Sequence, residues 1–393
     1  MPDDRRLQLG SFLSHLVESL DISDTQREEA VKHYEAVGNW LKAQDSPIAM
    51  YGPQIYPQGS FRLGTMIKPI NDNDQYDIDL VCELKMLAKD RLTQKQLKDM
   101  VGDRLKQHKT YSQLLDREEG RRCWKLNYAD SARFHMDILP CVPDSQGMNI
   151  LLENAGFSGS YWTESAIAIT DKTLPNYSTP DVDWPKSNPV GYCEWFKDRM
   201  SQQYFTTRQF LAESMCARIE DVPEYKVKTP LQRAIQILKR HRDIMFADDK
   251  DNRPTSIIIS TLAAWSYNNE GDLMDALQKI VIRMPRYIES REGSSWVPNP
   301  VNPMENYADR WREHPQRESN FRKWLQQIQV DFNVALQSKS LHEMTESLKP
   351  RFGDRIINET AKKVFSDTLI SASKVASVPP IIHISQPSEP WGV

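Results

Sequence analysis

Two short stretches, QGSFRLGT at residues 58–65 and YDIDLVCEL at residues 76–84, decide the fold of this chain. The first predicts a turn and a short helix, in which Gly59 lets the backbone approach a ligand closely. Ser60 offers a hydroxyl and an amide at a helix start, where phosphate is favoured. The second stretch predicts a strand, and side chains two apart on a strand share a face, so Asp77 and Asp79 project together. Adjacent carboxylates repel unless a cation lies between them, and hard oxygen ligands beside a phosphate site suit Mg²⁺.

Simpler interpretations of both stretches exist. A Gly-Ser pair alone is usually a turn, and a lone Asp-x-Asp is usually a solvated strand edge. Here the second stretch is largely apolar, which predicts a buried strand and makes solvated carboxylates a poor explanation. The spacing from Gly59 to Gly64 is that of a P-loop, but Thr65 and Met66 stand where that loop requires Lys followed by Ser or Thr.

A Gly-Ser turn followed by Asp-x-Asp between apolar residues resembles the nucleotidyltransferases of the DNA polymerase β superfamily. The fuller strings at residues 57–65 and 76–80 resemble, more narrowly, the bacterial cGAS/DncV-like nucleotidyltransferases (CD-NTases), and the resemblance runs from about residue 23 to about residue 369. Members of that family make cyclic oligonucleotide signals in anti-phage (CBASS) systems. The resemblance implies an α+β fold, with a polymerase β-like palm of mixed β-sheet and helices, a helical C-terminal lobe, and a long N-terminal spine helix that joins them.

The domain organisation expected from the sequence has three parts. Residues 1–150 are expected to hold the spine helix and the catalytic core, residues 151–370 a mostly helical second lobe, and residues 371–393 a Pro-rich polar tail. An apolar stripe over residues 8–22 and a capping box at Thr25 and Glu28 predict a helix that runs to about Ala43.

A third carboxylate stands in a later apolar run. Residues 123–128 and 133–140 predict two strands around a turn at Asp130-Ser131, the second strand ending at Pro140. Asp137 is the acid of that second strand, and the resemblance implies that it binds the metal that activates the acceptor hydroxyl. His135 shares its face and is more often a packing residue in such a place.

A helix that starts strongly at Thr229-Pro230 carries the next candidates. Lys239 stands at the edge of its apolar stripe, where a Lys is ordinarily solvated. The resemblance implies instead that Lys239 and the later Ser256 clamp the donor's β- and γ-phosphates, with Arg242 and His241 as weaker candidates.

Three further residues are nucleotide-binding candidates. Arg62 belongs to the Gly-Ser stretch, and Lys186 and Asn188 stand in a segment that, by resemblance, skirts the acceptor pocket. The alternative for that segment is a structural turn, in which Asn188-Pro189 precedes a helix starting near Glu194.

Composition narrows the class of protein. The formal net charge is −4 and there is no long Lys/Arg run, which disfavours constitutive binding to long nucleic acid. The first residues carry no apolar signal sequence, and the longest apolar run, residues 257–265, is too short for a bilayer. Five scattered cysteines without Cys-x-x-Cys point to the cytoplasm.

The combined residues predict nucleotidyl transfer with two Mg²⁺, for which Mn²⁺ can substitute, about 3.5–4 Å apart. Asp77 and Asp79 would bind both ions and Asp137 one of them. The first hypothesis is an enzyme that joins ATP and/or GTP into a cyclic di- or trinucleotide. The second is a linear oligoadenylate or RNA-tailing transferase, and the third is an inactive binding subunit, against which the three acids argue. The sequence contains neither Gly-x-Ser-x-Gly nor His-Glu-x-x-His, which argues against the usual hydrolases and zinc proteases.

The partners follow from the resemblance. A cyclic product would activate a downstream effector, and a partner with ubiquitin-activating-like domains would conjugate the C-terminus to a target. Gly392 suits such chemistry, whereas the terminal Val393 departs from the usual small last residue, and a plain polar tail is the alternative. The identity of the product is not determined by the sequence.

Overall fold

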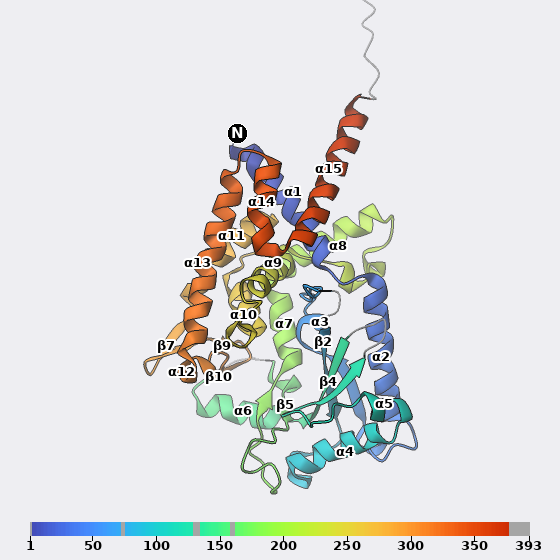
Figure 1. The fold of residues 1–393 in the computed structure, drawn as a ribbon. Coiled ribbons are helices and arrows are strands. Elements are labelled where there is room, and N and C mark those ends of the chain that lie inside the picture. Colours follow the sequence, from blue (N-terminus) through green and yellow to red (C-terminus); the bar gives the residue numbers. More distant parts are fainter. Residues whose placement is uncertain (1, 72–74, 129–133, 158–161, 377–393) are drawn as a thin grey trace, which may run out of the picture.

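A mixed β-sheet forms the centre of the lower lobe in Figure 1. The structure is a computed structural model, and it describes residues 2–71, 75–128, 134–157 and 162–376. The strand order is β1-β2-β4-β5-β6, and β3 also pairs with β4. The strands are β1 (Pro53–Pro57), β2 (Tyr76–Leu84), β3 (Trp124–Tyr128), β4 (Phe134–Pro143), β5 (Ile167–Ile169) and β6 (Lys186–Ser187).

The parallel pair β2·β4 is the core of this sheet, and the other pairs are antiparallel. Both strands are apolar and almost wholly buried from their middle onward, as near-continuous apolar runs predict. The expected end of the second strand at Pro140 is wrong, because β4 continues to Pro143. Beyond the end of β3, strand β5 pairs with Cys141–Pro143 and gives those residues a new partner.

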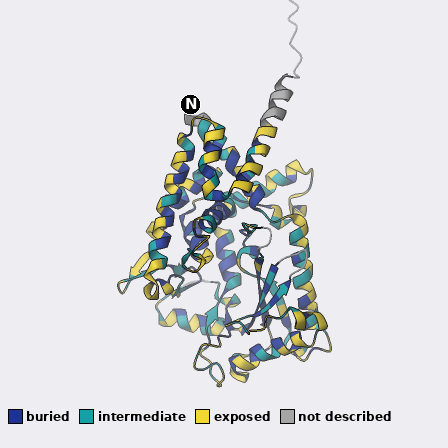
Figure 2. Cartoon of the chain, viewed as in Figure 1, coloured by how far each residue is buried: buried dark blue, intermediate teal, exposed yellow. Residues whose placement is uncertain are grey.

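Helices cover the sheet on its outer sides, and buried residues run through the centre of both lobes (Figure 2). Capping boxes start two of these helices, at Ser23 and at Thr93. The helices of this lobe are α2 (Asp24–Lys42), α3 (Gly59–Arg62), α4 (Gln94–Lys106), α5 (Lys109–Leu114) and α6 (Ser145–Asn154).

The second lobe is mostly helical and is built around α9. Thr229 caps α9 and Pro230 is its first residue, which confirms the predicted start. The helices of this lobe are α1 (Pro2–Leu20), α7 (Pro189–Arg199), α8 (Ser201–Ser214), α9 (Pro230–Met245), α10 (Ser256–Ser266), α11 (Leu273–Arg283), α12 (Arg310–Glu313), α13 (Pro315–Gln337), α14 (Leu341–Phe352) and α15 (Asp354–Ala376).

The mixed sheet with a helical second lobe confirms the α+β fold class, but the spine is two helices rather than one. Ser23 has an extended backbone, and its hydroxyl accepts a hydrogen bond from the N–H of Gln26. It therefore interrupts the helix expected over this segment and caps a new one. The capping box is therefore at Ser23 and Gln26 instead of Thr25 and Glu28. The side chains of α1 pack in the core of the helical lobe, whereas α2 packs on β1 and α4.

Two small antiparallel sheets lie outside the main sheet, in residues 289–306. Helix α15 ends at Ala376, inside the segment 371–393 that was expected to be a polar tail, and residues 377–393 lie outside the described part, as does the turn expected at Asp130-Ser131. The extra strands are β7 (Glu289–Arg291), β8 (Ser294–Trp296), β9 (Pro298–Asn299) and β10 (Asn302–Asn306). In the described residues, no helix is both long and apolar enough to cross a membrane.

Candidate active site

The Gly-Ser turn lies directly against the second acid of the Asp-x-Asp pair. Gly59 has a φ of +61°, and a Cβ built on it would lie 2.5 Å from Oδ2 of Asp79. The N–H of Gln58 donates to the carbonyl of Asp79 at 2.8 Å. Because only glycine avoids both the collision and the strained φ, this residue brings the turn and the strand together.

The three acids lie in one patch of the parallel pair β2·β4. In the register, Asp79 lies opposite Asp137 and Asp77 lies opposite His135. Burial, Asp137 and Asp77 raise the pKa of Asp79 to about 6, while Lys239 and Lys125 oppose the shift. Burial also raises the pKa of Asp137, against the effect of Lys125. The patch therefore concentrates negative charge, and a bound cation would reduce the repulsion among the three carboxylates.

The donor set fits a hard divalent cation. Oδ1 of Asp137 is buried without a hydrogen-bond partner, and Nζ of Lys125 lies 3.7 Å from it, beyond hydrogen-bond distance. Carboxylate oxygens are the ligands that Mg²⁺ prefers. Over the described ranges, no three His, Cys, Asp or Glu side chains form a preassembled metal cluster. The acids are thus neighbours along the strands without converging on one point.

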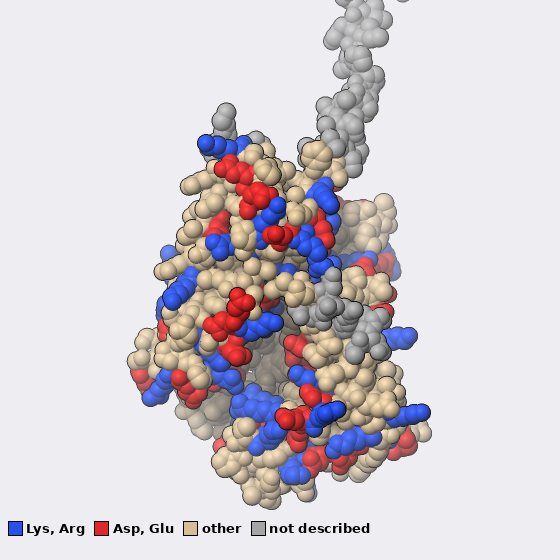
Figure 3. Space-filling view, viewed as in Figure 1, with Lys and Arg blue, Asp and Glu red and all other residues tan. Residues whose placement is uncertain are grey.

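The patch opens into a cleft of about 680 Å³ between the two lobes. The sheet lobe contributes Gly59, Ser60, Asp77 and Asp79, and helices α9 and α10 contribute cations and hydroxyls from the opposite side. Figure 3 shows one face of the molecule, hollowed between the lobes and carrying acidic and basic side chains around the hollow. A second cavity of about 640 Å³ lies among α1, α9 and α11 and contains none of the three acids, so the chemistry belongs to the first.

Lys239 lies inside the protein rather than on a solvated face. Its side chain is 4% exposed, and Nζ donates to the carbonyl and the Oγ1 of Thr65 at 3.1 and 3.2 Å. Burial, followed by Arg242, lowers the pKa of Lys239 to about 7, while Asp243 and Asp79 oppose the shift. Its ammonium lines the cleft across from the acids.

Ser256 and Arg242 reach the cleft together. Oγ of Ser256 accepts from Nη1 of Arg242 at 2.9 Å, and the same nitrogen donates to the carbonyl of Pro254 at 3.1 Å. His241, by contrast, is buried and bonds Asp331 on α13 at 2.9 Å, which is a structural contact.

Known proteins resemble this chain in sequence and in fold. Residues 53–140 match the family described as "Cyclic GMP-AMP synthase DncV-like, nucleotidyltransferase domain". A c-di-GMP synthase of Roseivirga ehrenbergii is 29% identical over 351 residues, which cover 89% of this chain and 85% of that protein. The cyclic dinucleotide synthase CdnG of Bradyrhizobium diazoefficiens is 26% identical over 378 residues, covering 92% of this chain and 84% of that protein.

Residues 53–140 form a nucleotidyltransferase domain of the cGAS/DncV-like (CD-NTase) family. The structure of the Bradyrhizobium diazoefficiens CD-NTase CdnG in complex with GTP has the same fold, with a TM-score of 0.68 at 23% identity over 90% of this chain and 98% of that one. The structure of Vibrio cholerae DncV with ATP, GTP and 5MTHFGLU2 has a TM-score of 0.51 at 15% identity, covering 90% and 87%. These two structures show the fold, whereas the family match and the two curated relatives show that this CD-NTase is a nucleotidyltransferase enzyme.

Three of the predicted nucleotide-binding residues do not line the cleft of this CD-NTase. Arg62 lies over the ring of Tyr56 at 5.8 Å from its centroid. Asn188 caps α7, and its amide donates to the carbonyl of Trp162 at 2.8 Å, so its polar atoms are occupied by the fold. Nζ of Lys186 lies 3.9 Å from Asp144. The open alternative, a structural role for the segment around Asn188, agrees with this geometry, but the helix begins at Pro189 rather than near Glu194, because Asn188 caps it.

The cleft also contains residues that the sequence analysis did not select. Thr65 is the last residue of the Gly-Ser stretch and Lys68 lies three residues after it, and Lys250 and Arg253 precede the Pro-Thr-Ser start of α10. For Thr65 and Lys68, the available sequence signal was their closeness to the Gly-Ser stretch. The basic pair before α10 resembled an ordinary surface loop and gave no signal.

Proposed function

We propose that this CD-NTase joins GTP and/or ATP into a cyclic di- or trinucleotide by successive transfers in the cleft between its lobes. One observation carries the proposal: the Gly59 turn, the acids Asp77 and Asp79, and the Lys239–Arg242–Ser256 group line one cleft of about 680 Å³, and Asp137 lies opposite Asp79 on the neighbouring strand β4. The relatives that align over most of the chain carry the names of c-di-GMP synthase and cyclic dinucleotide synthase. They support a cyclic dinucleotide, and GTP as a substrate, in particular.

The roles of the residues follow from their positions. Asp77, Asp79 and Asp137 would hold two Mg²⁺, or Mn²⁺ in its place. When bound, such ions supply charge stabilisation at the α-phosphate and favour ionisation of the acceptor hydroxyl. Gly59 and Ser60 would offer main-chain N–H groups to the donor phosphates.

The clamp would come from the helical lobe. Lys239 and Arg242 are buried cations on α9, and cations with little water around them bind phosphate oxygens through charge-assisted hydrogen bonds. Ser256 stands at the start of α10, beside Arg242. Oδ1 of Asp137 is buried and accepts no hydrogen bond from the described residues, which suits it to orient the acceptor hydroxyl.

A linear oligoadenylate or an RNA-tailing activity is the second candidate, because it uses the same acids. The net charge of −4 favours small nucleotides over a long acidic polymer. The choice between products depends on how the second nucleotide sits in the cleft.

Product analysis tests the proposal. We would incubate the purified chain with all four NTPs and Mg²⁺ and identify the products by mass spectrometry. Digestion with nuclease P1 and phosphatase then separates 3′–5′ links, which P1 cuts, from 2′–5′ links, which resist it. A cyclic product made by the wild type but not by an Asp77→Ala/Asp79→Ala variant supports the proposal. Linear products alone would establish the second candidate, and no product from any NTP would refute both.

The wider context is also part of the proposal. We infer a cytoplasmic enzyme from its five unpaired cysteines, and an anti-phage signalling role, with a product-activated effector, from the family. C-terminal conjugation by a ubiquitin-activating-like partner rests on the sequence of the tail. Vibrio cholerae DncV, with ATP and GTP, is one fold neighbour, and the CdnC:HORMA complex of E. coli is another. The three-part division at residues 150 and 370 is proposed with two changes: α1 belongs to the core of the helical lobe, and β5 and β6 belong to the sheet.

A further inference from the structure

Helix α9 holds the loop that follows the Gly-Ser turn by the oxygen atoms of its main chain. Loop 63–69 crosses from the sheet lobe to the helical lobe and forms one wall of the cleft. Side chains of α9, together with Lys228 just before it, donate to most of its carbonyls. The accepting carbonyls are those of Leu63, Gly64, Thr65, Met66, Lys68 and Pro69.

Gln232 makes the first of these contacts, and its amide is held at both ends. Nε2 donates to the carbonyl of Leu63 at 2.9 Å, and Oε1 accepts the N–H of Thr229 at 2.9 Å within the capping box of α9. Gly64 has a φ of +68°, and a Cβ on it would lie 2.5 Å from this Nε2. The loop therefore passes so close to Gln232 that only glycine fits there.

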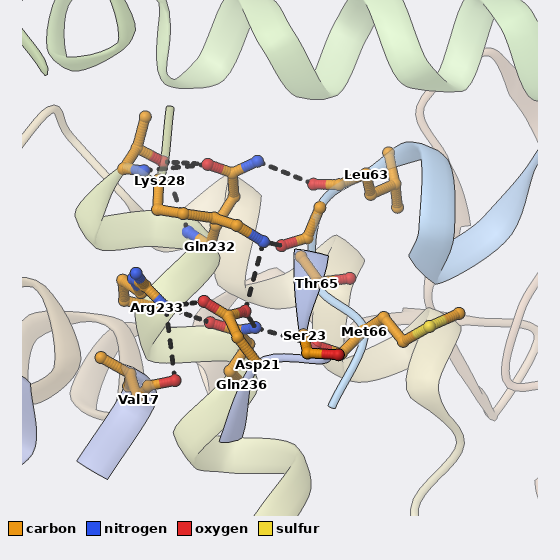
Figure 4. A network of polar contacts seen from close by, with 12 residues as sticks. Val17, Asp21, Ser23, Leu63, Thr65, Met66, Lys228, Gln232, Arg233 and Gln236 are labelled. Carbon is orange, nitrogen blue, oxygen red and sulfur yellow. Dashed lines mark hydrogen bonds and ion pairs between the residues drawn. The ribbon is translucent and has the colours of Figure 1, made fainter. Parts of the chain in front are cut away.

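Gln236, one turn further along α9, makes the second contact. Its Nε2 donates to the carbonyl of Met66 at 2.8 Å and to Oδ1 of Asp21 at 2.6 Å (Figure 4). Asp21 lies at the break between α1 and α2 and also binds Arg233 and Lys228. Burial opposes ionisation of Asp21, but the two cations and Gln236 hold its pKa below the ordinary value. The charged carboxylate thus fixes the direction of the Gln236 amide.

The loop passes this constraint to the Gly-Ser turn. The N–H of Thr65 donates to the carbonyl of Ser60 at 3.0 Å, so the two segments are hydrogen-bonded. We propose that Gln232 and Gln236 are positioning residues for the nucleotide cradle: by holding the carbonyls of Leu63 and Met66, they keep Gly59 and Ser60 in place against Asp79. This proposal rests on the proposed function, because the cradle serves catalysis only if nucleotides bind there.

The physical reason is the cost of an unpaired buried carbonyl. A main-chain oxygen that loses its donor away from water keeps the full penalty of its desolvation, so the loop would move to find another partner. Displacing a reacting group by about 1 Å costs on the order of 10²-fold in rate. An apolar side chain of the same length at either position would therefore loosen the loop without opening a cavity.

Gln232→Met and Gln236→Met test the proposal, with Gln327→Met as the matched control. Gln327 also donates to a carboxylate within the helical lobe, at 2.8 Å to Asp331, but lies away from the cleft. We would measure hydrogen exchange of the peptide covering residues 58–70, the melting temperature, and kcat and KM for NTP. We expect exchange in residues 58–70 to accelerate at least about tenfold and kcat/KM to fall at least about tenfold in both variants, and neither to change in the control.

Two outcomes would overturn the proposal: unchanged exchange in residues 58–70, or faster exchange spread equally over the whole chain. If Gln236→Met does not fold, Asp21→Asn replaces it, because the new amide retains one oxygen that can accept from Gln236 but loses the charge and the second oxygen, which binds Arg233. We then expect faster exchange in residues 58–70 that is smaller than for Gln232→Met, and no change there refutes the proposal. Exchange is measured without turnover, so a wild type that makes no product would refute the proposed function separately.

Discussion

Gly59 and Asp79 lie so close together that a first side-chain carbon on Gly59 would come within 2.5 Å of Oδ2 of Asp79. The contact joins the turn that is proposed to bind phosphate to the strand that is proposed to bind metal. Since the two groups must act on one nucleotide, a rigid contact of this kind sets the distance between them.

Replacement of Gly59 by Ala should therefore impair activity more than stability. The new methyl group would push on the Asp79 carboxylate, and we expect kcat to fall at least about 10²-fold, as for a misplaced reacting group. Gly293→Ala is the matched control, because Gly293 also has a positive φ, of +74°, but no described atom lies within 4 Å of its built Cβ. The measurement is steady-state product formation beside thermal unfolding. Equal losses of activity in the two variants would contradict this role for Gly59.

The double variant Asp77→Ala/Asp79→Ala should make no detectable product. It removes oxygen ligands whose charge is needed in the transition state, a loss of more than about 10³-fold. Asp99→Ala/Asp103→Ala removes the same charge from the outer side of α4 and should retain activity. Circular dichroism would verify that both variants are folded. Turnover by the first variant at a rate near that of the wild type would show that Asp77 and Asp79 are not needed for catalysis.

Lys239→Ala should raise the KM for NTP more than it lowers kcat. One charge-assisted contact to phosphate contributes about 1.5–3 kcal/mol, which corresponds to about an order of magnitude or more in kcat/KM. Lys98→Ala is the control for buried lysines, because Lys98 is fully buried on α4 and also donates to main-chain carbonyls. We expect the control to lose stability with an unchanged KM. An unchanged KM in Lys239→Ala would show that Lys239 does not bind the NTP and only holds Thr65 in place.

The affinity for NTP should fall as the pH rises from about 7 to about 9. Burial and Arg242 lower the pKa of Lys239 to about 7, so above that pH the side chain must take up a proton to bind phosphate. KM should then rise by at most about tenfold per pH unit, whereas Asp79, with a pKa of about 6, is ionised throughout this range. Arg242, Asp243 and Asp79 are the charged groups that act on Lys239.

Stability should change in the opposite direction over the same pH range. Between the folded pKa of about 7 and the ordinary value of 10.5, the unfolded chain binds more protons at Lys239 than the folded one. The free energy of unfolding therefore rises with pH, by at most about 1.4 kcal/mol per unit from this group. Lys239→Met should remove both slopes, which we would measure by initial rates and urea unfolding. A pH-independent KM in the wild type would refute the assignment of Lys239 as a phosphate-binding residue that titrates near pH 7.

The local features of this fold were predictable because each depends on a few neighbouring residues. The stretch at residues 58–65 predicts a turn and short helix, since Gly59 alone tolerates the required φ. The run at residues 76–84 predicts a strand with two acids on one face. Thr229 and Pro230 predict the start of α9 through a hydrogen bond within one turn, and the structure contains that bond.

Features that depend on distant residues were not predictable in the same way. The apolar stripe at residues 8–22 and the capping box at Thr25 and Glu28 indicated a long spine helix to about Ala43, but Asp21 binds cations of the helical lobe and Ser23 caps a second helix, so the chain turns there. Lys239 was placed at the edge of a stripe, yet loop 63–69 covers it and supplies Thr65 as its acceptor. A helical pattern contains no information about which other segment will cover its polar face.

The sequence by itself determined the kind of site: a Gly-Ser turn, paired acids on a buried strand and a third acid on another. The tertiary structure decided which residues meet. The parallel register of β2 and β4 places Asp79 opposite Asp137, and α9 brings Lys239 and Arg242 to the cleft while Arg62 and Asn188 turn to structural contacts. The physical reason is that residue type and backbone propensity are local, whereas register, burial and the pairing of main-chain carbonyls arise only when remote segments pack together.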